Sequence, residues 1–156
     1  MGAIASGGVE VLNDDVVAEY GIPADVIRAV AQRETEELQR RLAQYRGTRP
    51  LPSIANQVVI LVDDGLATGS TMRAAVAAVR QQSPRAVVVA VPVGATSTCE
   101  EFKAEADEIV CLRTPPDFMA VGAWYEDFSQ TTDEEVRQLL AESAAQAAGP
   151  TLPTIH

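Results

Sequence analysis

Three short, continuous apolar runs dominate the second half of the sequence and constrain its fold most strongly. They lie in QVVILVDD (57–64), RAVVVAVPV (85–93) and DEIVCLR (107–113). Helical patterns separate them, an amphipathic one at 70–82 and a shorter one at 98–106. Strict alternation of strand and helix indicates βαβ units with parallel strands, and apolar runs without polar alternation are typical of strands buried on both faces. The sequence therefore predicts an α/β fold, a mostly parallel twisted sheet with helices flanking both faces.

The first 50 residues follow a different pattern. GAIASGGVEVLN predicts two short strands around Gly7-Gly8, which is a hairpin signal. Residues 23–46 have apolar residues near helical spacing after Pro23, a residue that the first turn of a helix tolerates. We interpret this segment as a long helix that forms a flap, with its arginines and glutamates on a solvated face.

Two spacings indicate the starts of later helices. Thr98 with Glu101, and Thr132 with Glu135, each have the Thr-x-x-Glu spacing of a capping box. We expect one helix to begin at Thr98 and the last helix to cover residues 133–147.

The chain has 156 residues, about the length of one ordinary domain. We expect a single domain over residues 1–148, with the hairpin and flap helix in 1–50 and the core in 57–148. We expect residues 149–156 to form a C-terminal tail.

Charge and composition exclude several classes of function. The formal net charge of −10 argues against a nucleic-acid or anionic-membrane surface. No apolar run is long enough to span a bilayer, and no signal peptide is evident. Cys99 and Cys111 are the only cysteines, and we expect them to stay reduced in a cytoplasmic protein. The only histidine is the last residue, His156, which argues against histidine-based acid–base chemistry.

The strongest candidate site follows the first apolar run directly. Two adjacent carboxylates, Asp63 and Asp64, stand where a strand of a parallel sheet should end, the edge at which such sheets bind ligands. The next loop leads into a helix N-terminus, where free N–H groups and the helix dipole favour an anion. We expect this loop to hold a phosphate, through residues that combine close backbone approach with hydroxyl donors: Gly65, Leu66, Ala67, Thr68, Gly69, Ser70 and Thr71.

The loop has neither the Gly-Lys-Ser/Thr end of a P-loop nor the spacing of a dinucleotide fingerprint. Carboxylates beside a phosphate would repel it, but they accept hydrogen bonds from sugar hydroxyls and bind hydrated Mg²⁺. The combination predicts a ribose 5-phosphate ligand. A simple strand-to-helix turn, with Asp, Ser and Thr acting only as caps, is the alternative interpretation.

The segment VILVDDGLATGST closely resembles the phosphoribosyl pyrophosphate (PRPP) signature of the type I phosphoribosyltransferases. The likeness extends from about residue 2 to 140, and it is strongest to a bacterial group of predicted members. It implies a Rossmann-like phosphoribosyltransferase fold. It also implies that Asp63 and Asp64 hold the ribose hydroxyls, that the loop from Gly65 to Thr71 binds the 5-phosphate, and that Mg²⁺ bridges ribose and pyrophosphate oxygens.

In that family a nitrogenous base displaces pyrophosphate from C1 of PRPP, so the resemblance implies a phosphoribosyl transfer or binding of a nucleoside 5-monophosphate. Members also carry an upstream pyrophosphate loop. We expect that loop to be missing here, with weak or absent turnover. A non-catalytic nucleotide-binding module that regulates a partner, and a structural subunit, remain alternatives.

The aromatic pair at 124–125 and Cys99 each allow two interpretations. Trp124 and Tyr125 either pack as a lid over the sheet edge or stack on the acceptor base. We expect Cys99 to pack rather than to act as a nucleophile, because no histidine base is at hand. An exposed hairpin and flap favour a homo-oligomer.

Overall fold

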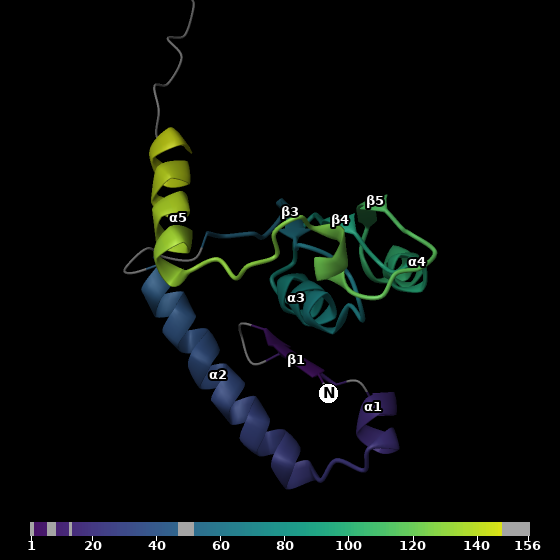
Figure 1. Cartoon of the computed structure of the whole chain (residues 1–156). Helices are drawn as coiled ribbons and strands as arrows, with labels where there is room; N and C mark the ends of the chain where they lie inside the picture. Colours follow the sequence, from purple (N-terminus) through teal and green to yellow (C-terminus); the bar gives the residue numbers. More distant parts are fainter. Residues whose placement is uncertain (1, 6–8, 13, 47–51, 148–156) are drawn as a thin grey trace, which may run out of the picture.

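The computed structural model of the chain describes residues 2–5, 9–12, 14–46 and 52–147. A hairpin, a long helix and an α/β unit follow one another along the chain (Figure 1). The strands are β1 (Gly2–Ala5), β2 (Val9–Leu12), β3 (Val58–Val62), β4 (Ala86–Val93) and β5 (Glu108–Arg113). The helices are α1 (Asp14–Glu19), α2 (Ala24–Arg46), α3 (Ser70–Arg80), α4 (Thr96–Glu105), the 3₁₀ turn η1 (Val121–Trp124) and α5 (Asp133–Ala147).

The three apolar runs form the predicted parallel sheet. Its strand order is β3-β4-β5, and both pairs are parallel, with Val58 opposite Ala86 and Val88 opposite Glu108. The predicted hairpin is also confirmed, because β1 and β2 pair antiparallel with Gly2 opposite Leu12. The turn that joins them, with Gly7 and Gly8, lies outside the described residues.

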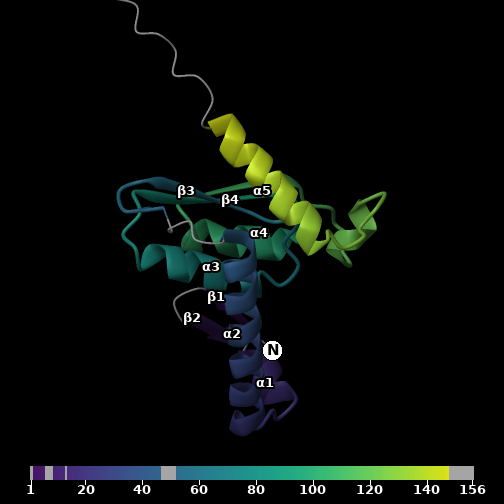
Figure 2. The same cartoon turned by 90° about the vertical axis from the view of Figure 1, so that its left-hand side faces the viewer.

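Helices α3 and α4 cover the same face of the sheet (Figure 2). The chain moves from β3 to β4 to β5 in one direction, and right-handed crossovers taken in one direction place both helices on one side. The prediction of helices on both faces is therefore wrong for the described residues. The buried core lies between sheet and helices and consists of Leu66, Met72, Val76, Val87, Val89, Val91, Cys99, Phe102 and Ala106.

The opposite face of the sheet is apolar and open among the described residues. The prediction that these strands are buried on both faces is wrong for the edge strands, where Ile60 of β3 is 62% exposed and Leu112 of β5 is 75% exposed. Val58, Val62 and Val110 belong to the same exposed set. Contiguous apolar surface of this kind often marks a place where another polypeptide packs.

The hairpin packs on the far side of α3, so the molecule has three layers: hairpin, helices and sheet (Figures 1 and 2). Met72 and Val76 belong to the sheet-side core, whereas Ala74 and Ala78 are buried without joining it. Two residues correspond to about 200° of helix rotation, so these alanines lie on the other side of α3. Their small side chains allow β1 and β2 to approach the helix closely.

The long helix predicted at 23–46 is present as α2, which extends past the hairpin and meets α5 near its C-terminal end (Figure 1). Tyr45 of α2 donates a hydrogen bond to Asp133 of α5, and Arg40 pairs with the same carboxylate at 3.4 Å. The predicted capping box of α5 is confirmed: the Thr132 N–H donates to the Glu135 carboxylate at 2.8 Å, and the Glu135 N–H donates to the Thr132 hydroxyl at 3.3 Å. None of the helices in the described ranges could cross a membrane.

Candidate functional site

The acid pair lies at the carboxyl end of β3. The Asp63 N–H extends the ladder to the Ala90 carbonyl at 3.4 Å, and the Asp64 N–H donates to the Asp63 carboxylate at 2.9 Å. Asp63 is half-buried and Asp64 is exposed. Burial raises the pKa of Asp63 above its ordinary value, although the hydrogen bond from Asp64 opposes that rise. A partly desolvated carboxylate beside an exposed one suits the hydroxyls of a diol.

Leu66 anchors the loop that follows to the sheet. Its side chain is 1% exposed and belongs to the core. Its N–H donates to the Val93 carbonyl at 3.0 Å, and its carbonyl accepts from the Ala95 N–H at 2.8 Å. Both backbone groups of Leu66 are therefore engaged, and this residue fixes the loop in place.

The next three carbonyl groups of the loop all accept hydrogen bonds, one from Thr98 of α4 and two from Arg73 of α3. The Thr98 hydroxyl donates to Ala67 O at 2.6 Å. The Arg73 guanidinium donates to Thr68 O at 2.7 Å, and the Arg73 backbone N–H donates to Gly69 O at 2.8 Å. These bonds determine the direction of each peptide plane.

In a trans peptide the N–H points opposite to the preceding carbonyl, and the described residues contain no cis peptide. The N–H groups of Thr68 and Gly69 therefore point away from Thr98 and Arg73. No acceptor among the described residues takes a hydrogen bond from these N–H groups or from those of Ser70 and Thr71, which open α3. The Thr68 and Ser70 hydroxyls lie 3.3 Å apart beside them. The segment thus presents backbone and hydroxyl donors together at a helix N-terminus, as an anion site requires.

The back wall of the loop is formed by α4. Gly69 has φ +73°, and a Cβ there would lie 2.6 Å from the Phe102 ring and 3.0 Å from the Thr98 methyl. Phe102 is fully buried and Thr98 is 6% exposed. A glycine at this position therefore allows the left-handed turn and the close approach to the ring.

Thr98 corrects a prediction from the sequence. It does not cap α4, which begins two residues earlier at Thr96 with Ala95 as its N-cap. The helix starts early because Ala95 is already held by Leu66, and the Cys99 N–H makes the first helical bond to the Ala95 carbonyl at 3.0 Å. Thr98 and Glu101 are thus interior helix residues that face the loop and Arg73.

Sequence reasoning also missed Arg73. Its guanidinium pairs with Glu105 at 2.7 Å and with Glu101 at 2.6 Å, both on α4, and lies 5.1 Å from the centroid of the Phe102 ring. A cation near the N-terminal end of a helix opposes the helix dipole. That unfavourable placement, with two glutamates four residues apart on the next helix, is the sequence signal that could have identified it.

The 121–128 segment packs against the acid pair. The Tyr125 hydroxyl donates to the Asp64 carbonyl at 2.6 Å, and a Cβ on Gly65 would lie 2.8 Å from the Val121 side chain. The Tyr125 ring also packs on Phe128, with centroids 5.2 Å apart. Trp124 is 43% exposed. The structure thus brings Tyr125 to the acid pair as an anchor and leaves part of the Trp124 ring open.

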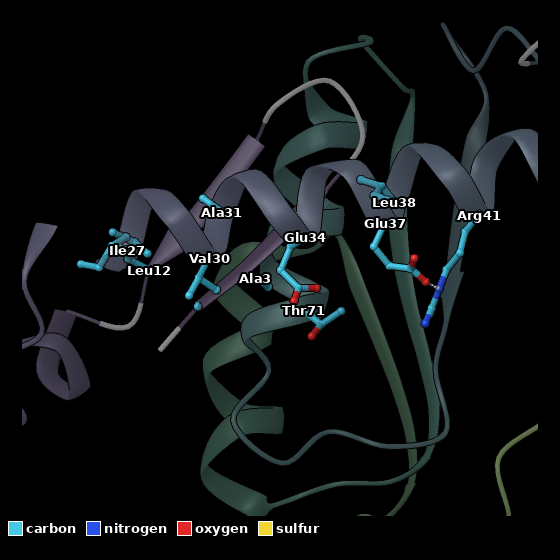
Figure 3. Close-up of a pocket in the computed structure, with 11 residues that line it drawn as sticks. Ala3, Leu12, Ile27, Val30, Ala31, Glu34, Glu37, Leu38, Arg41 and Thr71 are labelled. Atoms are coloured by element: carbon cyan, nitrogen blue, oxygen red, sulfur yellow. Dashed lines mark hydrogen bonds and ion pairs between the residues drawn. The ribbon is translucent and has the colours of Figure 1, made fainter. Parts of the chain in front are cut away.

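A separate hollow of about 430 Å³ lies between α2 and the hairpin (Figure 3). Only Thr71 links it to the loop, and Asp63 and Asp64 do not line it. Glu37 in its wall is bonded to Arg40 and Arg41, which hold the pKa of that carboxyl at about 2. The charged side chains in its wall are those of Glu34, Glu37 and Arg41, and the hollow lies apart from the acid pair.

The residues fit a hydrated magnesium ion better than a metal caged by protein. No group of three or more Asp, Glu, His or Cys side chains gathers in the part of the chain that the structure describes. Asp63 and Asp64 supply only hard oxygen ligands. Mg²⁺ commonly binds through one or two carboxylates while keeping water and substrate oxygens.

Several known proteins are similar to this chain in sequence or in fold. Residues 3–126 match the phosphoribosyl transferase domain family. Two Mycobacterium tuberculosis proteins, from strains CDC 1551 and H37Rv and each named "Putative phosphoribosyl transferase", are 44% identical over 135 residues. That alignment covers 86% of this chain but only 30% of each relative.

The crystal structure of TT1426 from Thermus thermophilus is also similar, with a TM-score of 0.70 and 41% sequence identity. The match covers 89% of this chain and 65% of TT1426. The predicted phosphoribosyltransferase fold is thereby confirmed. With the parallel sheet and the loop geometry, these matches show that the chain belongs to the phosphoribosyl transferase domain family.

Proposed function

We propose that the chain binds PRPP or a nucleoside 5-monophosphate and transfers the phosphoribosyl group to a nitrogenous base with release of pyrophosphate. The observation that carries this proposal is the orientation of the 67–69 peptides. Their carbonyls accept hydrogen bonds from Thr98 and Arg73, so the N–H groups of Thr68 and Gly69 point away from these two residues, in the loop that follows the acid pair. A phosphate and a sugar diol are the two ligand ends that such a site accommodates.

In this proposal the 5-phosphate accepts hydrogen bonds from the N–H groups of residues 68–71 and from the Thr68 and Ser70 hydroxyls. Asp63 and Asp64 accept hydrogen bonds from the two ribose hydroxyls. Mg²⁺, when bound, would neutralise charge on the pyrophosphate. The base nitrogen forms the new bond to C1 as pyrophosphate leaves with the old bonding pair, and the proton on that nitrogen passes to the solvent or to the leaving pyrophosphate. The protein orients the ribose for that exchange.

Trp124 and Tyr125 take different roles in the proposal. Tyr125 anchors the 121–128 segment through the Asp64 carbonyl. Trp124, which is partly open, is the residue available to stack on the acceptor base.

A non-catalytic nucleotide-binding module is the second candidate. It is favoured by the state of Arg73, the arginine two residues beyond the loop, whose guanidinium is committed to Glu101, Glu105 and Thr68. A cation so engaged is not open to a pyrophosphate. Homo-oligomerisation, expected from the sequence, and a cytoplasmic location also stay predictions.

A pyrophosphate-release assay with PRPP, Mg²⁺ and a panel of bases separates the two candidates. Turnover with one base class, lost in Asp63→Asn/Asp64→Asn, is the expected result for the enzyme. Phosphate-dependent thermal stabilisation without turnover would favour the binding module instead. Unaltered PRPP binding in the double variant would contradict the site itself.

A further inference from the structure

Arg73 reaches the phosphate loop from behind. It projects from α3, passes over the Phe102 ring and ends against the Thr68 carbonyl. The same guanidinium meets Glu101 and Glu105. An arginine beside a phosphate loop would ordinarily be interpreted as a phosphate ligand, because a guanidinium matches phosphate geometry well.

The geometry of the side chain excludes that interpretation. Each of its three nitrogens has a partner: Nε bonds to Glu105 at 2.7 Å, one terminal nitrogen to Glu101 at 2.6 Å, and the other to Thr68 O at 2.7 Å. The side chain is 25% exposed. Turning it toward the ligand face would break two ion pairs and release the Thr68 carbonyl.

We infer that Arg73 is a positioning residue for the phosphate site, one that sets the direction of the Gly69 amide by holding the Thr68 carbonyl. The inference rests on the proposed function. Thr98 does the same for the adjacent peptide, because its hydroxyl holds the Ala67 carbonyl and so directs the Thr68 amide.

The positive charge of Arg73 contributes to the site as well as its hydrogen bond to the Thr68 carbonyl. A hydrogen bond from a cation polarises the peptide that accepts it, and this makes the N–H on the other side of that peptide a stronger donor. Glu101 and Glu105 hold the guanidinium at this place. The cluster therefore assists phosphate binding without touching the phosphate.

Binding of ribose 5-phosphate, measured by calorimetry on the whole chain with ribose as the phosphate-free comparison, tests the inference. Arg73→Met should weaken ribose 5-phosphate binding roughly tenfold, since the charged hydrogen bond that orients one amide is lost. Arg80→Met is the matched control: Arg80 lies on the same helix and pairs with Asp107 at 2.8 Å, but it has no bond to the loop. Its affinity should stay within about twofold of the parent.

Thr98 supplies an independent pair of variants should Arg73→Met not fold. Thr98→Val keeps the shape and loses the hydroxyl, whereas Thr98→Ser keeps the hydroxyl. Weaker binding in the valine variant with recovery in the serine variant is expected. The Thr68 amide resonance should lose its phosphate-induced NMR shift in Thr98→Val, and the Gly69 amide resonance should lose its shift in Arg73→Met. A role limited to fold stability would lower the urea midpoint of Thr98→Val but would leave the affinity of the folded variant for ribose 5-phosphate unchanged.

The outcomes are distinguishable. If the parent binds ribose 5-phosphate and both Arg73→Met and Thr98→Val bind it equally well, the positioning role is wrong while the proposed function stands. If the parent binds ribose 5-phosphate no better than ribose, the proposed phosphate site is wrong, and the role of Arg73 is overturned with it.

Discussion

Replacing Gly69 by alanine should destabilise the fold and distort the phosphate loop together. The residue has φ +73°, a region that costs an L-residue about 1–2 kcal/mol. The new methyl group would also lie 2.6 Å from the ring of Phe102, which is fully buried and cannot move without disturbing the core. Such overpacking adds about 1–3 kcal/mol, so the expected loss is about 2–5 kcal/mol of the free energy of unfolding.

Gly21→Ala is the matched control for this change. Gly21 also has positive φ, +55°, but a Cβ there has nothing within 4 Å. It should therefore lose only the backbone part, about 1–2 kcal/mol. Urea denaturation of both variants and the parent, analysed at equal m-values, isolates the clash with Phe102 as the difference between the two losses. Equal destabilisation of the two variants would refute the account of the loop packed against α4.

Four further predictions concern single side chains. Burial raises the pKa of Asp63, so the ionised Asp63 carboxylate destabilises the fold. Asp63→Asn should therefore raise the urea midpoint at neutral pH. The difference in midpoint from the parent should shrink as the pH falls through the carboxyl pKa. The Val87 N–H and Arg80 lower the pKa of Asp107, so the parent should lose stability as the pH falls below the unfolded pKa of about 4. Asp107→Asn should lose less over that range. Equal slopes of unfolding free energy against pH in the two proteins would count against the hydrogen bond. Cys99 should resist a thiol reagent in the folded chain while Cys111 reacts, because burial raises the pKa of the Cys99 thiol to about 12; rapid labelling of both would contradict its burial. Tyr125→Phe should lower the free energy of unfolding by about 0.5–1.5 kcal/mol and change the fluorescence of Trp124, the only tryptophan. An unchanged emission spectrum would show that the Tyr125 hydroxyl does not hold this segment.

The sheet could be predicted from the sequence because its signal is local. Each apolar run is long enough for one strand, and the helical patterns between the runs leave parallel pairing as the simple solution. The open face could not be predicted in the same way. A run such as VVILV has the same composition whether one or both of its faces are covered, and what covers the second face is not encoded in the run.

The acid pair and the loop could be located from residue types, but their internal geometry could not. Thr98 has the spacing of a capping box. In the structure, the hydrogen bond from the Ala95 N–H to the Leu66 carbonyl accompanies an earlier start of α4, and the Thr98 hydroxyl donates to the Ala67 carbonyl instead. The role of Arg73 depends on contacts with Glu101 and Glu105, which lie 28 and 32 positions further along the chain. Tertiary contacts of this kind override local signals.

An amide NMR titration of the chain with ribose 5-phosphate tests the phosphate site most directly. The N–H groups of the loop and of the first turn of α3, those of Thr68, Gly69, Ser70 and Thr71, should show the largest shifts. Asp63→Asn/Asp64→Asn should weaken the binding of the sugar while inorganic phosphate still shifts the same amides. Largest shifts in the hollow between α2 and the hairpin, or none in the loop, would contradict the assignment of this loop as the phosphate site.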